Sequence, residues 1–274
     1  RALLEQAEVV VHDHEVDPRI LALAGPDAER IDVGHAGPGA LAEEAISYLI
    51  VEKAIEGKRV ARLKWGDPFI FDRGGEEALF LRQQGIDLEV VPGVPIAVAA
   101  SAFAGIPVTY PGAGDTLTII RGQDDTGTTM PDVDWKAVAG LNGTVLSCAS
   151  AHQLPRMLHA LLTHGCPPDM PAAIVRNGTL PSQTTEVSTV GALAEALGGQ
   201  TRREGGLLIV GRVVRFREHL RWFDARPLFG RSVLVTRPKD QAEEFTAHLT
   251  ALGARVIGLP LIEIRPALNP GALE

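Results

Sequence analysis

Short apolar segments alternate with amphipathic segments and glycine-rich turns, and residues 60–93 show this pattern most clearly. Val60 to Leu63 predicts a strand, a predicted helix begins at Gly74 and ends at Gly85, and residues 87–91 predict a second strand. Strand, helix and strand within about 34 residues match the size of a βαβ unit, so we expect parallel strands. The pattern predicts an α/β fold.

A tight turn follows each of these two strands. Trp65-Gly66-Asp67-Pro68 comes after the first, and Pro92-Gly93 comes after the second. In an open parallel sheet, ligands bind at the carboxyl ends of the strands, where both turns would lie. Turns of this composition are also common as purely structural connections, so the turns alone leave both interpretations open.

The same patterns continue on both sides of this stretch. A long amphipathic helix is predicted at residues 40–56, and an alanine-rich helix at residues 97–104. The other predicted strands are 8–11, 30–33, 116–120, 144–148 and 171–176, and the other predicted helices are 135–139, 153–165 and 192–197. Because Tyr110-Pro111-Gly112 is typical of a hinge, we place a domain boundary there, which gives two α/β halves, 1–112 and 113–225.

The pattern begins again after a linker at residues 226–230. Residues 231–265 predict one strand, one helix and a second strand. One such unit cannot bury both faces of its strands, so we expect residues 226–274 to be an incomplete α/β domain.

Composition narrows the possible functions. The 274 residues are 45% hydrophobic and 22% charged, as in ordinary globular proteins, and the net charge is -8. The acidic balance argues against a nucleic-acid partner. The sequence contains no apolar run of membrane-spanning length, and its first residues have no signal-peptide pattern, so we expect a cytoplasmic protein without a membrane partner.

Three motifs together resemble a known family. LKWGDPFIFDRGGEE at 63–77, VVPGV at 90–94 and SAFAGIPVT at 101–109 resemble the uroporphyrinogen-III C-methyltransferases of the tetrapyrrole methylase superfamily. The resemblance implies two α/β halves with a cofactor cleft between them. It also implies methylation of the tetrapyrrole substrate uroporphyrinogen III to precorrin-2 with S-adenosylmethionine as cofactor, and a homodimer.

Residues 226–274 resemble the opening of uroporphyrinogen-III synthase. The product of that enzyme is the substrate of the methyltransferase, so the resemblance implies a bifunctional enzyme of sirohaem or cobalamin biosynthesis. In the family, a strand and a Gly/Pro-rich cofactor loop precede the point where this sequence begins. Because the sequence begins at Arg1 without Met, we expect that first strand to be missing from it.

The resemblance also assigns two catalytic residues. Asp13 matches an acidic residue proposed as a proton acceptor, although an aspartate after a strand could instead cap the short helical stretch at residues 18–24. His35 stands where the family has a lysine suggested as a proton donor. Histidine has a shorter reach and a conditional charge, so this role would be altered.

The cofactor contacts implied by the resemblance are Trp65, Gly66, Asp67, Ile70, Pro95, Ile96, Ala149 and Gly178. Two of these positions depart from the family, which has glycine at Trp65 and methionine at Ala149. A backbone that approaches a ligand closely prefers glycine, so Trp65 either points away from the cofactor or crowds it.

The implied substrate carries many carboxylates, so an acidic protein must concentrate positive charge locally. Cationic residues near predicted strand ends could provide it, or they could be ordinary solvated surface charges: Arg62, Lys64, Arg73, Arg121, Arg176 and Arg212. Two rival functions stay open. The chain could methylate a later precorrin, or it could be a degenerate, non-catalytic methylase half that serves as a partner of the synthase domain.

Overall fold

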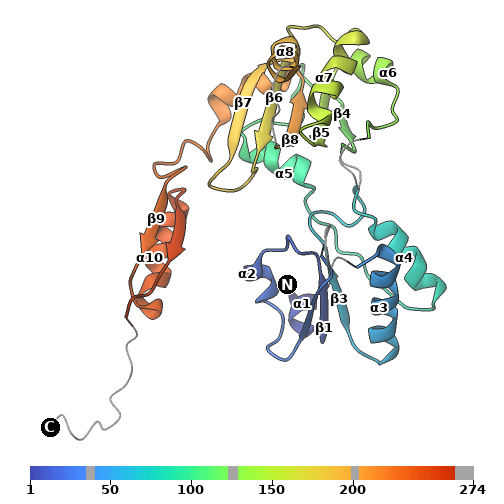
Figure 1. The fold of residues 1–274 in the computed structure, drawn as a ribbon, viewed down its shortest axis with the longest axis vertical. Helices are drawn as coiled ribbons and strands as arrows, with labels where there is room; N and C mark the ends of the chain where they lie inside the picture. The colour runs from blue at the N-terminus through green and yellow to red at the C-terminus, as the bar shows by residue number, and fades with distance from the viewer. Residues whose placement is uncertain (35–40, 123–128, 199–203, 263–274) are drawn as a thin grey trace, which may run out of the picture. The chain divides into compact units, whose positions relative to one another are not determined.

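The computed structural model describes residues 1–34, 41–122, 129–198 and 204–262. The chain divides into two compact units, residues 1–96 and 97–274 (Figure 1). The compact division falls at Ile96, whereas the predicted methylase halves meet at Gly112. The predicted boundaries, 1–112, 113–225 and 226–274, stay a prediction.

The first unit contains a parallel sheet of three strands in the order β2-β1-β3. Its strands are β1 (Val9–His12), β2 (Glu29–Asp32) and β3 (Val60–Leu63), and its helices are α1 (Ala2–Gln6), α2 (Pro18–Leu21), α3 (Glu43–Ile55) and α4 (Gly74–Gln83). The predicted strands and helices up to Gly85 are therefore confirmed within the described residues. The strand β1 pairs in parallel with both of its neighbours, whereas the parallel unit expected within residues 60–93 is not formed.

The central strand β1 supplies both cores of this unit. Val9 and Val11 pack with Ile46 and Ile50 of α3, while Val10 packs on the opposite face of the sheet with residues of α1 and the segment after α2. Successive side chains of a strand point to opposite faces, so an unbroken apolar strand fills two cores at once. The carboxyl end of β1 is thereby held between two packed layers.

The strand predicted at residues 87–91 is wrong: the described residues contain no strand there. Arg82 provides a physical reason. Its side chain pairs with Asp87, and its Nη2 donates a hydrogen bond to the Leu88 carbonyl at 3.4 Å. That carbonyl therefore has a side-chain donor, and Val91 is 58% exposed, which is unlike a strand buried in a parallel sheet.

The second unit contains a mixed sheet of five strands in the order β4-β5-β8-β6-β7. Only β4 and β5 pair in parallel, while β8 pairs antiparallel with both β5 and β6. The strands are β4 (Leu117–Ile120), β5 (Thr144–Ala149), β6 (Pro171–Arg176), β7 (Thr184–Thr189) and β8 (Gly206–Val210). The helices α5 (Ile96–Phe103), α6 (Trp135–Gly140), α7 (Gln153–Thr163) and α8 (Val190–Gly198) agree with the predicted ones.

The chain continues through two short helical segments, η1 (Arg212–Phe216) and α9 (Arg217–Leu220). The predicted strand–helix–strand segment follows as β9 (Ser232–Val235), α10 (Lys239–Ala251) and β10 (Arg255–Gly258), and the two strands form a parallel pair. Within the described part of the chain this pair has no third strand, and Leu234 and Ile257 are about half exposed. None of the helices in the described ranges has the length and apolar character needed to span a membrane.

Candidate active site

The two turns predicted from the sequence are joined by Asp67. Its Oδ1 accepts a hydrogen bond from the Phe69 amide at 2.9 Å, and its Oδ2 accepts one from the Gly93 amide at 3.0 Å. The backbones of the turns are in close contact, because a Cβ atom at Gly93 would lie 2.1 Å from the Gly66 carbonyl oxygen. Asp67 therefore has a structural role in this unit, whatever it contacts in a ligand.

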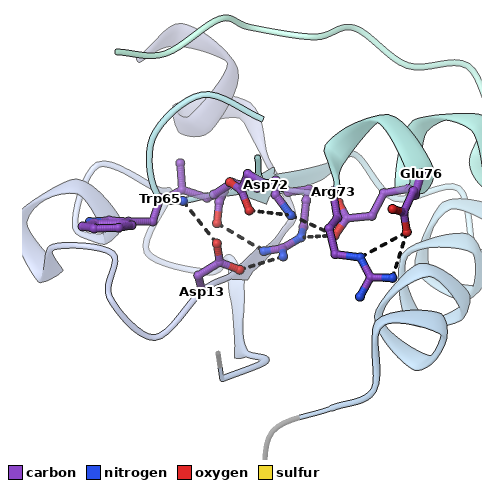
Figure 2. Close-up of polar contacts among 9 residues, drawn as sticks. Asp13, Trp65, Asp72, Arg73 and Glu76 are labelled. Carbon is purple, nitrogen blue, oxygen red and sulfur yellow. Dashed lines mark hydrogen bonds and ion pairs between the residues drawn. The ribbon is translucent and has the colours of Figure 1, made fainter. Parts of the chain in front are cut away.

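Trp65 does not strain the turn in which it stands. The residue that needs glycine is Gly66, whose φ is 105°, while Trp65 is not among the residues with positive φ. Its side chain is half exposed, and Figure 2 shows the indole ring pointing away from Asp13 and Asp72. Whether Trp65 points away from the cofactor or crowds it stays a prediction.

Three further predicted cofactor residues lie on or near these turns. Ile70, on the loop that follows Asp67, is 41% exposed and offers an apolar side chain to the surface. Pro95 and Ile96 follow the second turn and are both partly buried. The first unit thus brings its predicted cofactor residues onto two adjoining segments of chain.

Asp13 lies buried immediately after β1, with 5% of its surface exposed. Its Oδ2 accepts a hydrogen bond from the Trp65 amide at 3.1 Å, and its Oδ1 forms an ion pair with Arg62 Nη2 at 2.6 Å (Figure 2). The alternative role as a helix cap is wrong, because α2 is capped by Asp17, whose carboxylate accepts from the Arg19 amide at 2.8 Å. Asp13 therefore connects the central strand to the first turn.

Asp13 belongs to a charged network of five residues, which are Asp13, Arg62, Lys64, Asp72 and Glu77. Glu77 Oε1 accepts from Arg62 Nε at 3.3 Å and from Lys64 Nζ at 3.1 Å, and Lys64 Nζ lies 3.4 Å from Asp72 Oδ1. No side chain of the network is more than 23% exposed. Burial raises the pKa of Asp72 to about 6, a shift that Lys64 partly opposes.

Sequence reasoning missed Asp72 and Glu77 as members of a site. One signal was available: Arg62 and Lys64 are two residues apart at the end of a strand, which places both side chains on one face of the sheet. Two cations on a buried face require carboxylates, and the acidic first turn of α4 supplies Glu77. Asp72 had no comparable signal, because its burial depends on the path of the loop from Pro68 to Gly74.

Most of the cations proposed for substrate carboxylates have partners within the chain. Arg62 and Lys64 are paired with the carboxylates of the charged network. Arg73 pairs with Glu76 at 2.9 Å, and Arg176 pairs with Glu186 at 3.2 Å. Three of these cations are largely buried, namely Arg62, Lys64 and Arg176. The interpretation of these three as ordinary solvated surface charges is therefore wrong.

In the second unit, Gly178 lies in a tight turn after β6. A Cβ atom there would lie 2.6 Å from the Ala100 Cβ atom of α5, so the turn and this helix pack closely. Thr179 donates its backbone amide to Gln183 Oε1 at 2.9 Å, which holds the turn in place. Ala149, in contrast, is 1% exposed, and its methyl group packs into the core of this unit. Ala149 as a cofactor-contacting position stays a prediction.

Backbone strain marks two of these segments. Among the described residues, the non-glycine residues with positive φ are Phe71, Arg73, Asn177 and Thr179. The first two flank Asp72, and the other two flank Gly178. Such conformations cost about 1–3 kcal/mol each and concentrate at functional sites. His35, the predicted proton donor, lies outside the described residues.

Known proteins resemble this chain over most of its length. The porphyrin biosynthesis protein HemD of Ruminiclostridium josui is 40% identical over 265 residues, which cover 96% of this chain and 52% of that protein. A sirohaem synthase of Neisseria meningitidis serogroup A is 40% identical over 221 residues, 80% of this chain and 45% of that protein. The chain thus spans about half the length of the curated relatives it matches.

The fold also matches a solved structure. The crystal structure of uroporphyrin-III C-methyl transferase from Thermus thermophilus, complexed with S-adenosyl homocysteine, is 33% identical with a TM-score of 0.64 and covers 78% of this chain and 90% of that one. The predicted α/β methylase fold is therefore confirmed. The family model of the tetrapyrrole (corrin/porphyrin) methylases matches residues 1–194. The chain belongs to the tetrapyrrole methylases.

Proposed function

We propose that the chain is an S-adenosylmethionine-dependent methyltransferase that converts uroporphyrinogen III to precorrin-2. The observation that carries this proposal is the position of Asp13, a buried carboxylate after the central strand whose two oxygens are fixed by Arg62 and by the Trp65 amide. The similarity to a uroporphyrin-III C-methyl transferase across 90% of that enzyme supports the choice of substrate.

S-adenosylmethionine supplies an electrophilic methyl group. The residues of the first unit fit such a ligand in three respects: the Trp65 ring is turned away from the polar cluster, Gly66 keeps its backbone free of a side chain, and Ile70 presents an exposed apolar surface. We propose Trp65, Gly66, Asp67, Ile70, Pro95 and Ile96 as cofactor contacts, mostly through backbone atoms. Gly178, and Ala149 through its backbone, are proposed as contacts from the second unit.

The chain's own residues act mainly by position. A pyrrole carbon of the substrate would take the methyl group as the methyl–sulfur bond breaks and S-adenosylhomocysteine leaves, and the methylated ring system must then lose a proton from another position. Asp13 accepts that proton at Oδ1 or Oδ2, while Arg62 and the Trp65 amide keep its carboxylate in one orientation. Holding two reactants in attacking geometry can contribute about 7–11 kcal/mol to lowering a barrier, so no covalent intermediate is needed.

We further propose that residues 226–274 begin a uroporphyrinogen-III synthase domain. The similarity to the R. josui protein supports this, because it covers 265 residues and so continues well past the residues matched by the methylase family. The parallel pair β9–β10 with α10 is the kind of unit from which such an α/β domain is built. A homodimer, implied by the family resemblance, is proposed on that basis alone.

The direct test is a methyl-transfer assay with S-adenosylmethionine and uroporphyrinogen III, read by product mass. Two added methyl groups are expected. Asp13→Asn should lose most turnover while still binding S-adenosylhomocysteine in a calorimetric titration. Asp17→Asn is the matched control, because it changes an aspartate of the same unit that caps α2 and pairs with Arg19 outside the charged network, and it should keep full turnover.

Each alternative predicts a different result. Cofactor binding without turnover of uroporphyrinogen III, but with turnover of a later precorrin, would place the chain in another step of the pathway. A folded protein that binds no S-adenosylhomocysteine would identify it as a non-catalytic partner of the synthase domain. Unchanged turnover of Asp13→Asn would remove Asp13 from the mechanism.

A further inference from the structure

We propose that Asp72 is a positioning residue whose ionised carboxylate balances the charged network, so that Asp13 can take up a proton. This inference rests on the proposed function, in which Asp13 is the proton acceptor. It goes further by assigning a role to a residue that neither the motifs nor the resemblance singled out.

The geometry connects the two aspartates through the cations between them. Arg62 contacts Asp13 at 2.6 Å and Glu77 at 3.3 Å, and Lys64 contacts Glu77 at 3.1 Å and Asp72 at 3.4 Å. Figure 2 shows Asp13 and Asp72 on the same side of the Arg73–Glu76 pair, joined by the dashed contacts of the residues between them. A change of charge at one aspartate therefore changes the electrostatic potential at the other, because the side chains between them are largely buried and poorly screened by solvent.

The charges explain why Asp72 matters. With every group ionised, three carboxylates face two cations, which leaves one negative charge in excess. When Asp13 accepts a proton from the methylated ring system, this excess is removed and the network becomes neutral. If Asp72 is already protonated, the same step leaves a net positive charge in a largely buried cluster, which is costly. Asp13 is thus a good proton acceptor only while Asp72 is ionised.

The surroundings of Asp72 make its charge easy to lose. Within the described residues, its second oxygen, Oδ2, is buried without a hydrogen-bond partner. Three charged groups act on Asp72. Arg62 lies in β3, Lys64 directly follows β3, and Asp13 follows the end of β1. Burial and the charge of Asp13 raise the pKa of Asp72 to about 6, while the two cations oppose the shift. The carboxylate therefore changes its charge close to physiological pH.

The first experiment measures kcat against pH for the parent, Asp72→Asn, Asp72→Glu and the control Asp17→Asn. In the parent, kcat should fall as the pH drops through the pKa of Asp72, about 6. Asp72→Asn should lose about tenfold in kcat at pH 8 and should lose this acidic limb, with the KM for S-adenosylmethionine unchanged. Asp72→Glu should restore most of kcat, and Asp17→Asn should match the parent.

A merely structural Asp72 would lower stability or raise KM and leave the shape of the pH profile unchanged. An Asp72→Asn variant with the parent's kcat and the parent's acidic limb would therefore overturn the proposal. If Asp72→Asn does not fold, Asp72→Glu still decides the matter, because a displaced acidic limb supports the role and an unchanged limb contradicts it.

The second experiment does not need turnover, so it separates this inference from the proposed function. Carbon-13 NMR of aspartate carboxyl groups follows the titration of Asp72 in the parent and in Asp13→Asn. Removing the charge of Asp13 should lower the pKa of Asp72, because that charge is one of the causes that raise it. An unchanged titration of Asp72 would show that the two aspartates are not coupled, whether or not the chain methylates uroporphyrinogen III.

Discussion

The adjacent glycines at the start of α4 should respond in opposite ways to the same substitution. A Cβ atom at Gly74 would lie 2.2 Å from the Pro68 carbonyl oxygen, whereas one at Gly75 would meet nothing within 4 Å. Gly74 is buried, and its amide donates to that same Pro68 oxygen at 2.9 Å. We therefore expect Gly74→Ala to push the first turn of the helix away from the Pro68 loop, and Gly75→Ala to fit without movement.

The magnitudes follow from three effects. Overpacking a tight contact costs about 1–3 kcal/mol, and losing the Gly74–Pro68 hydrogen bond costs about 1 kcal/mol more. Alanine in a helix gains about 0.5–1 kcal/mol over glycine in both variants, because the unfolded chain is less flexible. The net expectation is a loss of about 1–3 kcal/mol for Gly74→Ala and a gain of about 0.5–1 kcal/mol for Gly75→Ala.

Native-state hydrogen exchange is the suitable assay, because it reports the opening free energy of the first unit separately from that of the second. Amides of α4 and of the 65–71 loop should exchange about ten to a hundred times faster in Gly74→Ala and somewhat more slowly in Gly75→Ala. Amides of β6 in the second unit serve as the internal reference. Equal protection in the two variants would refute the close contact between Gly74 and Pro68.

Three further predictions concern aspartates. Asp67→Ala should destabilise the first unit by about 1–2 kcal/mol, because the Phe69 and Gly93 amides lose their acceptor, and hydrogen exchange at Gly93 should report it. Asp134→Ala should cost about 1 kcal/mol in urea denaturation, because its carboxylate caps α6, and Asp134→Asn should recover it. Burial raises the pKa of Asp72 from its ordinary value of 3.8 to about 6, so the native state binds the carboxyl proton more tightly than the unfolded state does. The free energy of unfolding of the parent should therefore fall as the pH rises from about 4 to about 6. Asp72→Asn cannot titrate at this position, so the difference in unfolding free energy between the variant and the parent should change by about 1–2 kcal/mol in favour of the variant from low to neutral pH. Urea denaturation at several pH values measures this difference, and a difference that does not change with pH would contradict the raised pKa.

The sequence was most informative where hydrophobic period and turn chemistry agree. The helix α3 and the Gly74-Gly75 start of α4 depend on local pattern, and both were predicted. The prediction of a strand at residues 87–91 failed, because the local pattern does not show that Arg82 provides a donor to the Leu88 carbonyl. The position of β8 between β5 and β6, antiparallel to both, could not be predicted from local pattern either, because tertiary contacts decide strand order.

The candidate site divides in the same way. The two turns could be named in advance from their composition after predicted strands, and Asp13 could be named from the family resemblance. The charged network could not be named fully, because Asp72 is buried through the strained path of the loop around Phe71 and Arg73. The structure was also needed to show that the turn accepts a tryptophan at position 65. The backbone angles show that the positive φ in this turn is at Gly66 and not at Trp65.

The place of β8 has a consequence for how the second unit is assembled during synthesis. β8 is the last strand of its sheet along the chain, yet it lies between β5 and β6, which do not pair with each other. Until residues 206–210 leave the ribosome, the β4–β5 pair and the β6–β7 hairpin each expose an open, apolar edge. Such edges recruit other strands, so a chain cut before Gly206 should aggregate rather than fold. The sheet closes only when its final strand is inserted at its centre.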